Sequence, residues 1–190
     1  MKRSTFTTRL FLVLPLFLLT ATGLAQPKLV KTKAGDDVTI YVPDSMIPMT
    51  PEDLAQRFPS VRAPLAAFTD MGRQAEFSVN VSATRWPDAN VEIAKDFFKA
   101  SLLNLYDRVD MIDEGISDIH KKKIVFFEFE SRTNGDKYKQ GLKDPVLNYS
   151  YTQYYVSKKH TIVFTFSCPK SMKDEWSSVV HDMMARVRVK

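Results

Sequence analysis

The three histidines and the single cysteine are the residue types in this chain that could most readily support catalysis or metal binding. His120, His160 and His181 lie far apart, and none falls in the HExxH or HxH spacing that zinc sites use. Cys168 ends an alternating apolar segment, which is typical of a buried thiol with no base beside it. His181 falls among polar positions of a predicted helix, which indicates a solvent-exposed imidazole. These residues predict no catalytic centre and no metal site.

Acidic side chains offer a second candidate for chemistry. Asp110, Asp113, Glu114 and Asp118 follow one another along a predicted strand, where a pair could hold a divalent cation or exchange protons. Strand parity places Asp110 and Glu114 on one face and Asp113 on the other, which favours an acidic, solvated strand. The sequence also contains no GxSxG, Walker or GxGxxG motif, and only six glycines. We therefore predict that the protein is not an enzyme and uses no cofactor.

A basic cluster at two predicted turns is the candidate binding site. Residues 120–123 and 157–160 form the first and third turns of a predicted four-stranded meander, so both turns lie at one end of the sheet. The chain that enters the preceding helix should reach the same end. The expected patch suits a lipid headgroup surface, an acidic protein or a polyanion, and its histidines would add charge below neutral pH. Alternatively, these lysines only keep the turns soluble and block edge pairing. The patch comprises Arg85, Trp86, His120, Lys121, Lys122, Lys158, Lys159 and His160.

Hydrophobic periodicity predicts the elements that position these residues. Helices are expected after the caps Thr50, Asn90 and Ser171, with Asp174 completing a capping box in the last. The predicted fold is α+β, a largely antiparallel twisted sheet with amphipathic helices packed on it. The expected strands are residues 38–42, 65–69, 75–83, 109–119, 123–131, 146–157 and 161–168.

Apolar patterns indicate how these elements pack. Residues 124–129 are apolar on both faces, which predicts a strand that is covered on each side. The second helix should bury Ala94, Phe97, Phe98, Leu102 and Leu105, and the last a stripe from Met172 to Val187. In residues 146–157, Tyr154 should lie opposite Tyr149, Tyr151 and Tyr155, so that at least one tyrosine is exposed. Whether these tyrosines belong to the core or to a recognition face remains open at this point.

The N-terminus has the pattern of a secretory signal peptide. Lys2, Arg3 and Arg9 precede a run of ten apolar residues, and Gly23 and Ala25 fit a cleavage site before Gln26. We predict a signal peptide at residues 1–25, an extended segment at 26–37 and one domain at 38–190. The signal carries three of 27 basic and none of 22 acidic residues, which leaves 24 basic against 22 acidic residues. Export to a bacterial periplasm or the exterior, without a transmembrane anchor after cleavage and without nucleic-acid binding, is the expectation.

Several local features resemble the PsbP-like superfamily, which includes the Ran-binding Mog proteins and small exported bacterial domains. These features are the opening VTIYVP, the helix at 91–108 followed by a long meander, and TFSCP leading into a final amphipathic helix. Asp44-Ser45 stands where such proteins often have glycine-tryptophan. The resemblance implies an α/β/α sandwich with a non-catalytic accessory or partner-binding role, and export would exclude the nuclear role of Mog.

Two functions follow as hypotheses from the sequence. The first is a non-catalytic extracytoplasmic accessory protein that binds an envelope or secreted protein, or an anionic surface. The alternative is a periplasmic protein that binds a small ligand or a cation, with a pocket under the loop at residues 133–145.

Overall fold

The structure is a computed structural model that describes residues 27–59, 62–82, 84–86, 90–134 and 144–190. The predicted signal peptide and most of the 133–145 loop lie outside these residues. Within the described part, one helix is short and two are long, and none is long and apolar enough to cross a bilayer.

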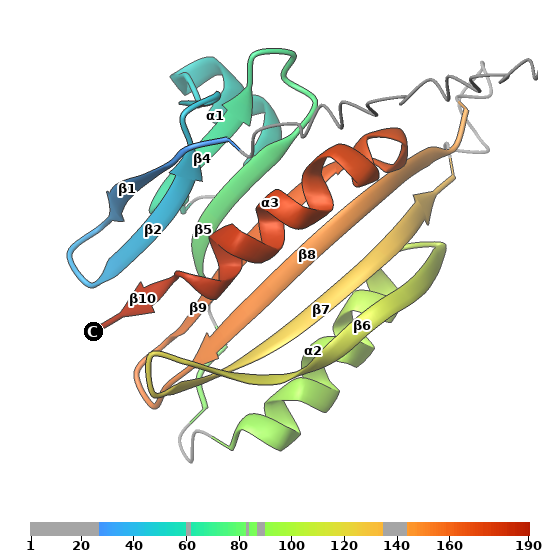
Figure 1. Ribbon diagram of the computed structural model, residues 1–190. Helices are drawn as coiled ribbons and strands as arrows, with labels where there is room; N and C mark the ends of the chain where they lie inside the picture. The colour runs from blue at the N-terminus through green and yellow to red at the C-terminus, as the bar shows by residue number, and fades with distance from the viewer. Residues whose placement is uncertain (1–26, 60–61, 83, 87–89, 135–143) are drawn as a thin grey trace, which may run out of the picture.

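A seven-stranded antiparallel sheet runs through the centre of the described chain (Figure 1). Its strand order is β3-β4-β5-β9-β8-β7-β6, so the predicted meander of β6 to β9 forms one half of the sheet. The antiparallel pairing confirms the predicted α+β fold class. The strands are β3 (Met46–Pro48), β4 (Ala66–Asp70), β5 (Glu76–Ser82), β6 (Arg108–Ile119), β7 (Lys122–Thr133), β8 (Val146–Val156) and β9 (Thr161–Pro169).

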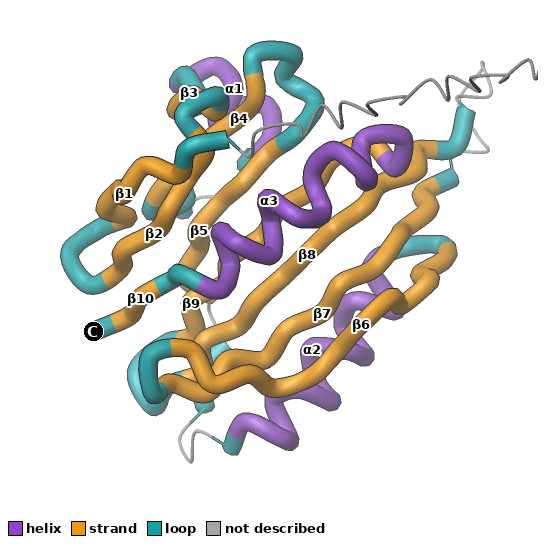
Figure 2. The backbone as a smooth tube through the Cα atoms, viewed as in Figure 1, coloured by secondary structure: helices purple, strands orange, loops and turns teal. Residues whose placement is uncertain are grey.

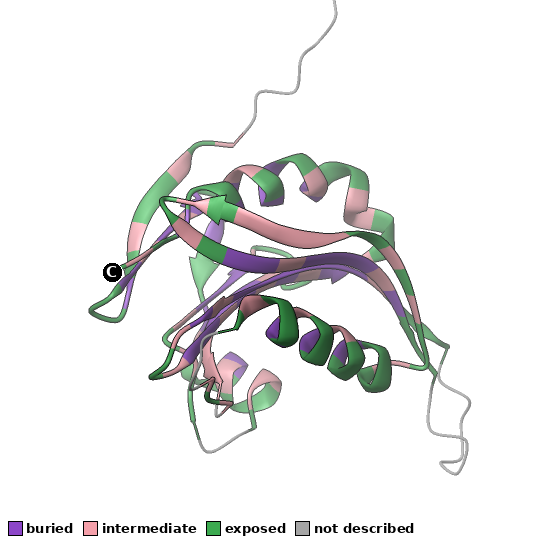
Figure 3. Cartoon of the chain, turned by 90° about the horizontal axis from the view of Figure 1, so that it is seen from below, coloured by how far each residue is buried: buried purple, intermediate pink, exposed green. Residues whose placement is uncertain are grey.

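Helices cover both faces of this sheet (Figure 2). Helix α2 (Val91–Leu105) packs against β6 and β7, and helix α3 (Lys173–Ala185) packs against β8 and β9 on the other face. A short helix α1 (Pro51–Arg57) lies between β3 and β4. The result is two layers of helix around one sheet, with the buried residues concentrated in the strands between them (Figure 3).

A small second sheet joins the two ends of the described chain. It has the order β1-β2-β10, where β1 is Leu29–Ala34, β2 is Val38–Pro43 and β10 is Arg188–Val189. The β2 side chains Ile40 and Val42 are buried in the core under α3. The strand β1 falls within the segment that the sequence predicts only as extended, and β10 follows directly after the last helix.

Two apolar clusters hold the layers together, one on each face of the sheet. Ile124 belongs to the cluster under α3, while Val125, Phe127 and Phe129 belong to the cluster under α2. The prediction that this strand is covered on both sides is therefore confirmed. The α3 stripe is also confirmed, since Trp176, Val179, Val180, Met183, Met184 and Val187 are all buried. Each of these side chains stabilises the fold by about 1.5–3 kcal/mol.

Two predictions about exposure are wrong. Tyr149, Tyr151 and Tyr154 are all buried and Tyr155 is partly buried, because α3 covers one face of β8 and α2 covers the other. The opposite placement of Tyr154 is confirmed. On α2, Phe97 and Leu105 are exposed, since the buried stripe is narrower than predicted and consists of Ala94, Phe98 and Leu102.

Helix caps follow the sequence at two of three positions. The Thr50 side chain accepts a hydrogen bond from the Asp53 backbone, and Asn90 caps α2 by accepting from the amides of Glu92 and Ile93. Ser171 is not a cap. It lies inside a 3₁₀ turn (Lys170–Met172) that leads into α3, and no side chain caps the start of that helix. The turn takes up the residues that the predicted capping box requires.

Candidate functional site

The two lysine-bearing turns lie at the same end of the main sheet. Ile119 pairs with Lys122 across the first turn, and Val156 pairs with Thr161 across the second. Since Tyr155 of β8 pairs with Ile124 of β7, both hairpins close on the same side. The segment with Arg85 also leaves β5 there, because Ser82 at the end of β5 pairs with Thr161.

Most of the predicted basic patch is exposed at this end. Arg85, His120, Lys121, Lys158 and Lys159 are exposed, and His160 is partly exposed. The lysines and the arginine of the patch have no ion-pair partner among the described residues; they are Arg85, Lys121, Lys122, Lys158 and Lys159. Elsewhere, Lys95, Lys99, Lys170 and Lys173 do form ion pairs. The five exposed residues together with Lys122 and His160 are called the basic end below.

Two members of the predicted patch have other contacts. The Trp86 ring packs edge-on against Phe97 and Phe98 of α2, with ring centroids 5.4 and 5.8 Å away. It therefore belongs to the cluster under α2 and supplies little exposed aromatic surface. Lys122 lies 5.7 Å above the ring of Tyr155, on the face that α3 covers.

The acidic run is rearranged by a β-bulge in β6. The register shifts between Met111 and Asp113, so Asp110 faces Glu130 and Asp113 faces Glu128. Asp110 and Asp113 thus share one face, whereas the parity of the sequence predicts that they are on opposite faces. An extra residue in one strand moves every later side chain of that strand to the opposite face of the sheet from the one that simple alternation predicts.

Glu114 is engaged with helix α2. Its carboxylate lies 2.8 Å from Nζ of Lys99 and 3.6 Å from Nζ of Lys95. The hydrogen bond from Lys99 lowers the pKa of Glu114 against the effect of burial. In the described part of the chain, no three His, Cys, Asp or Glu side chains are arranged to hold a metal ion.

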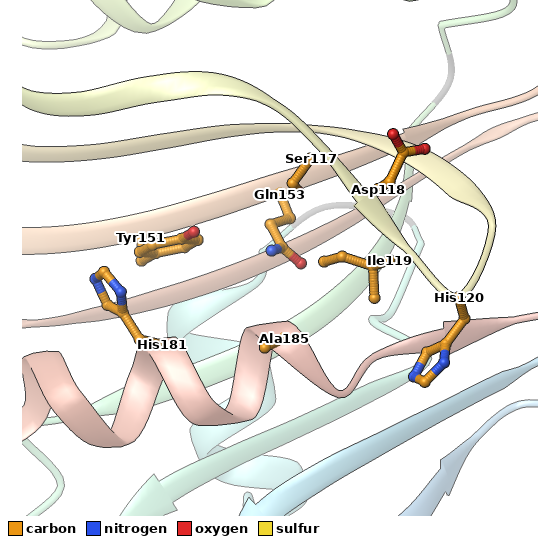
Figure 4. Close-up of a pocket in the computed structure, with 8 residues that line it drawn as sticks. All are labelled: Ser117, Asp118, Ile119, His120, Tyr151, Gln153, His181 and Ala185. Atoms are coloured by element: carbon orange, nitrogen blue, oxygen red, sulfur yellow. The ribbon is translucent and has the colours of Figure 1, made fainter.

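A polar pocket opens beside the basic end, between α3 and the β6–β7 hairpin (Figure 4). It has a volume of about 430 Å³. Tyr151 and Gln153 of β8 form its floor, and His181 and Ala185 of α3 form one wall. The opposite wall consists of Ser117, Asp118, Ile119 and His120 from β6 and its turn.

The turn that carries His120 has an unusual backbone. His120 and Lys121 have φ values of 50° and 65°, in the left-handed region that glycine and asparagine usually occupy in two-residue hairpins. This conformation is unfavourable for residues with a Cβ and is maintained by the pairing of the flanking strands. It places the imidazole of His120 at the rim of the pocket (Figure 4).

Gln153 is the least satisfied side chain of the pocket. It is only 1% exposed, and its Oε1 atom has no hydrogen-bond partner among the described residues. Its neighbour Tyr151 is also buried, and burial raises the pKa of Tyr151 to about 12 although a hydrogen bond from Gln153 opposes this shift. The Tyr151 hydroxyl therefore stays protonated at neutral pH and remains able to donate a hydrogen bond.

A buried carboxylate supports the other end of the pocket. Glu128 of β7 is 5% exposed, and its Oε1 accepts a hydrogen bond of 2.8 Å from the hydroxyl of Tyr149. Its Oε2 lies 2.9 Å from Nε2 of His181. His181 is exposed as predicted, but it is held to the sheet by this contact and by an edge-on contact with Tyr151.

Glu128 and Gln153 are functional-site residues that the sequence patterns do not predict. Both are polar residues at inward positions of strands whose other inward residues are apolar or aromatic, in IVFFEF and YSYTQYY. That interruption is the signal which could have identified them, because a buried polar group requires a partner. Cys168 is buried as predicted, and burial raises its pKa to about 12, so the thiol is not a nucleophile at neutral pH.

This arrangement, with helices on both faces of an antiparallel sheet, is similar to the fold of a solved PsbP protein. The structure is similar to cyanobacterial PsbP (CyanoP) from Synechocystis sp. PCC 6803, with a TM-score of 0.58 and 13% identity over 91% of this chain and 99% of that one. A protein of unknown function from Pseudomonas aeruginosa gives a TM-score of 0.50 and 8% identity over 83% of this chain and 94% of that one. No protein-family model matches the chain, and no curated protein is significantly similar in sequence. At these identities the likeness shows the fold alone.

Proposed function

We propose that this chain is an exported, non-catalytic accessory protein that docks on an acidic partner protein of the cell envelope through its basic end. The observation that supports this is the convergence of Arg85, Lys121, Lys122, Lys158 and Lys159 from three segments at one end of the sheet. None of these cations has an ion-pair partner among the described residues. Such unbalanced charge attracts an acidic surface and accelerates association with it.

The basic end favours a protein partner over a bilayer. Surfaces that insert into membranes combine lysines with exposed aromatic or aliphatic side chains. Here the aromatic residue of the predicted patch, Trp86, packs against Phe97 and Phe98. Trp86 therefore adds little apolar surface to the charged end, and the exposed Phe97 beside it supplies one apolar contact next to the cations.

Export is the second component of the proposal, and it is supported by the tripartite pattern of residues 1–25. The test is N-terminal sequencing of the protein expressed in a bacterial host and recovered by osmotic shock. We expect the mature chain to begin at Gln26. Recovery of an uncleaved chain from the cytoplasm would remove this component.

The docking surface is tested with two variants of equal charge change. In the first, Lys121, Lys158 and Lys159 are replaced by Gln. In the control, the exposed β1-side lysines Lys28, Lys31 and Lys33 are replaced by Gln. The readouts are retention on heparin as a model polyanion and crosslinking to proteins of an envelope fraction.

We expect the first variant to lose salt-sensitive retention and its acidic crosslinked partner, while the control keeps both. Equal losses in the two variants would mean that only net charge matters and would contradict the proposal. Binding to anionic lipid vesicles without any crosslinked protein would assign the surface to a membrane.

A further inference from the structure

We propose that the pocket between α3 and the β6–β7 hairpin binds a small uncharged molecule rich in hydroxyl groups, such as a monosaccharide. The pocket shares His120 with the basic end, but the proposal does not require docking through that end. It rests on the amide oxygen of Gln153, which has no hydrogen-bond partner in the described part of the chain, on the groups around it and on the size of the pocket.

The amide oxygen of Gln153 requires a hydrogen-bond donor. A buried carbonyl oxygen without a partner costs about 1–3 kcal/mol, so nearly all such groups in folded proteins are paired. Figure 4 shows the Gln153 amide projecting from β8 into the pocket, near Ile119 and Ala185. A ligand in this pocket can therefore supply the missing donor directly.

The surrounding groups define the kind of ligand. The hydroxyls of Tyr151 and Ser117 and the imidazoles of His120 and His181 can each donate or accept a hydrogen bond. Hydroxyl groups match such a lining because they also do both. A simple carboxylate or sulfate has no hydrogen to donate to Gln153.

Charge in the pocket is low. Asp118 contributes to the wall, but Figure 4 shows its carboxylate pointing away from the space enclosed by the other lining residues. Glu128 is occupied by Tyr149 and His181. A cationic ligand would therefore find no free carboxylate inside, which favours an uncharged molecule.

Size and shape agree with this class. The volume of about 430 Å³ falls in the lower part of the range of small-molecule sites. Ile119 and Ala185 supply apolar surface on opposite walls, where the C–H groups of a sugar ring can pack. The polar floor and apolar walls together match a molecule with hydroxyls at its edge.

The proposal is tested by titrating the purified protein with glucose, galactose and N-acetylglucosamine, and with sulfate and acetate as anionic probes that have no hydrogen to donate. The readout is the ¹H–¹⁵N spectrum, including the side-chain amide of Gln153. We expect at least one sugar to shift the signals of Gln153 and Ala185, and the anions to leave them unchanged.

Two variants and a control locate the site. Gln153→Met keeps the size of the side chain but removes the acceptor, and it should weaken sugar binding about tenfold or more. Ala185→Phe places a ring at the exposed rim and should block binding without affecting the core. Ala100→Phe, at an exposed alanine of α2 on the other face, should bind as the unchanged protein does.

The proposal is overturned if no sugar shifts these signals, in which case a water molecule alone satisfies Gln153. It is also overturned if the anions bind and the sugars do not. A Gln153→Met variant that binds as tightly as the unchanged protein, or an Ala185→Phe variant that folds and binds normally, would have the same consequence.

Discussion

Glu128 on β7 and His181 on α3 connect the central sheet to the last helix, with 2.9 Å between Oε2 and Nε2. The other oxygen of Glu128 accepts a hydrogen bond from Tyr149 on β8. One buried carboxylate thus links three elements across the face that forms the polar pocket. Because a buried charge is costly without partners, both contacts contribute to holding α3 in its place.

Replacing Tyr149 by Phe should lower the free energy of unfolding by about 1–3 kcal/mol, since Oε1 of Glu128 then loses its donor in the core. Urea denaturation followed by circular dichroism measures the effect. Tyr155→Phe is the control on the same face of β8, because its hydroxyl has no hydrogen bond among the described residues. If both variants lose the same stability, the Glu128 contact is not the cause.

The caps of the two long helices differ in a way that mutation can measure. Asn90→Ala removes a side chain that accepts from two backbone amides of α2, and it should cost about 1 kcal/mol of stability. Ser171→Ala should cost almost nothing, because Ser171 caps no helix. Thermal unfolding of the two variants compares them directly. A larger loss for Ser171→Ala would show that the cap predicted from the sequence forms in solution.

Cys168 should resist alkylation in the folded protein. Burial raises the pKa of its thiol to about 12, so almost no thiolate is present at pH 8. Mass spectrometry after treatment with iodoacetamide should show an unmodified chain in buffer and a modified chain in urea. Rapid modification of the folded protein would contradict the buried position of this thiol.

Stability should fall in alkali. Burial raises the pKa of Cys168 and of Tyr151 to about 12, and it also raises the pKa of Tyr149 and Tyr154. The unfolded chain releases these protons near pH 9–10. Between about pH 9 and pH 12, the folded state therefore binds more protons than the unfolded chain does. Each retained proton lowers the unfolding free energy by about 1.4 kcal/mol per pH unit, and below about pH 9 the contribution is fully present.

The measurement is urea denaturation at several pH values from neutral to strongly alkaline, with the tyrosine absorbance recorded in parallel. Folding and tyrosine ionisation should change together, because these phenols ionise only on unfolding. Tyrosine absorbance that rises fully while the protein remains folded would contradict the prediction.

The sequence predicts most of the helices and strands, but not the bulge in β6 or the short strands β1 and β10. The strands β6 to β9 and the helices α2 and α3 follow from periodicity, since each buries one face or both against a neighbour. The bulge near Ile112 is not predictable in this way, because one unpaired residue leaves no mark on composition and yet reverses the parity of Asp113. The strands β1 and β10 are missed because each depends on pairing with β2.

Of the two candidate sites, the basic end could be predicted from the sequence and the polar pocket could not. The basic end is predictable because its lysines lie in turns, and the topology of a meander determines where turns meet. The polar pocket is not predictable, since Gln153, His181 and His120 come from three separate elements. Its single hint in the sequence is a glutamine at an inward position between aromatic residues.

The pairing of β2 with both β1 and β10 makes the small sheet depend on both ends of the described chain. Residue Val38 pairs with Ala34 on one side and with Val189 on the other, and the amide of Lys190 donates to the carbonyl of Asp37. The small sheet is therefore completed by contacts that span nearly the whole described chain, which are slow to form. A nascent chain cannot close this sheet until β10 has been synthesised.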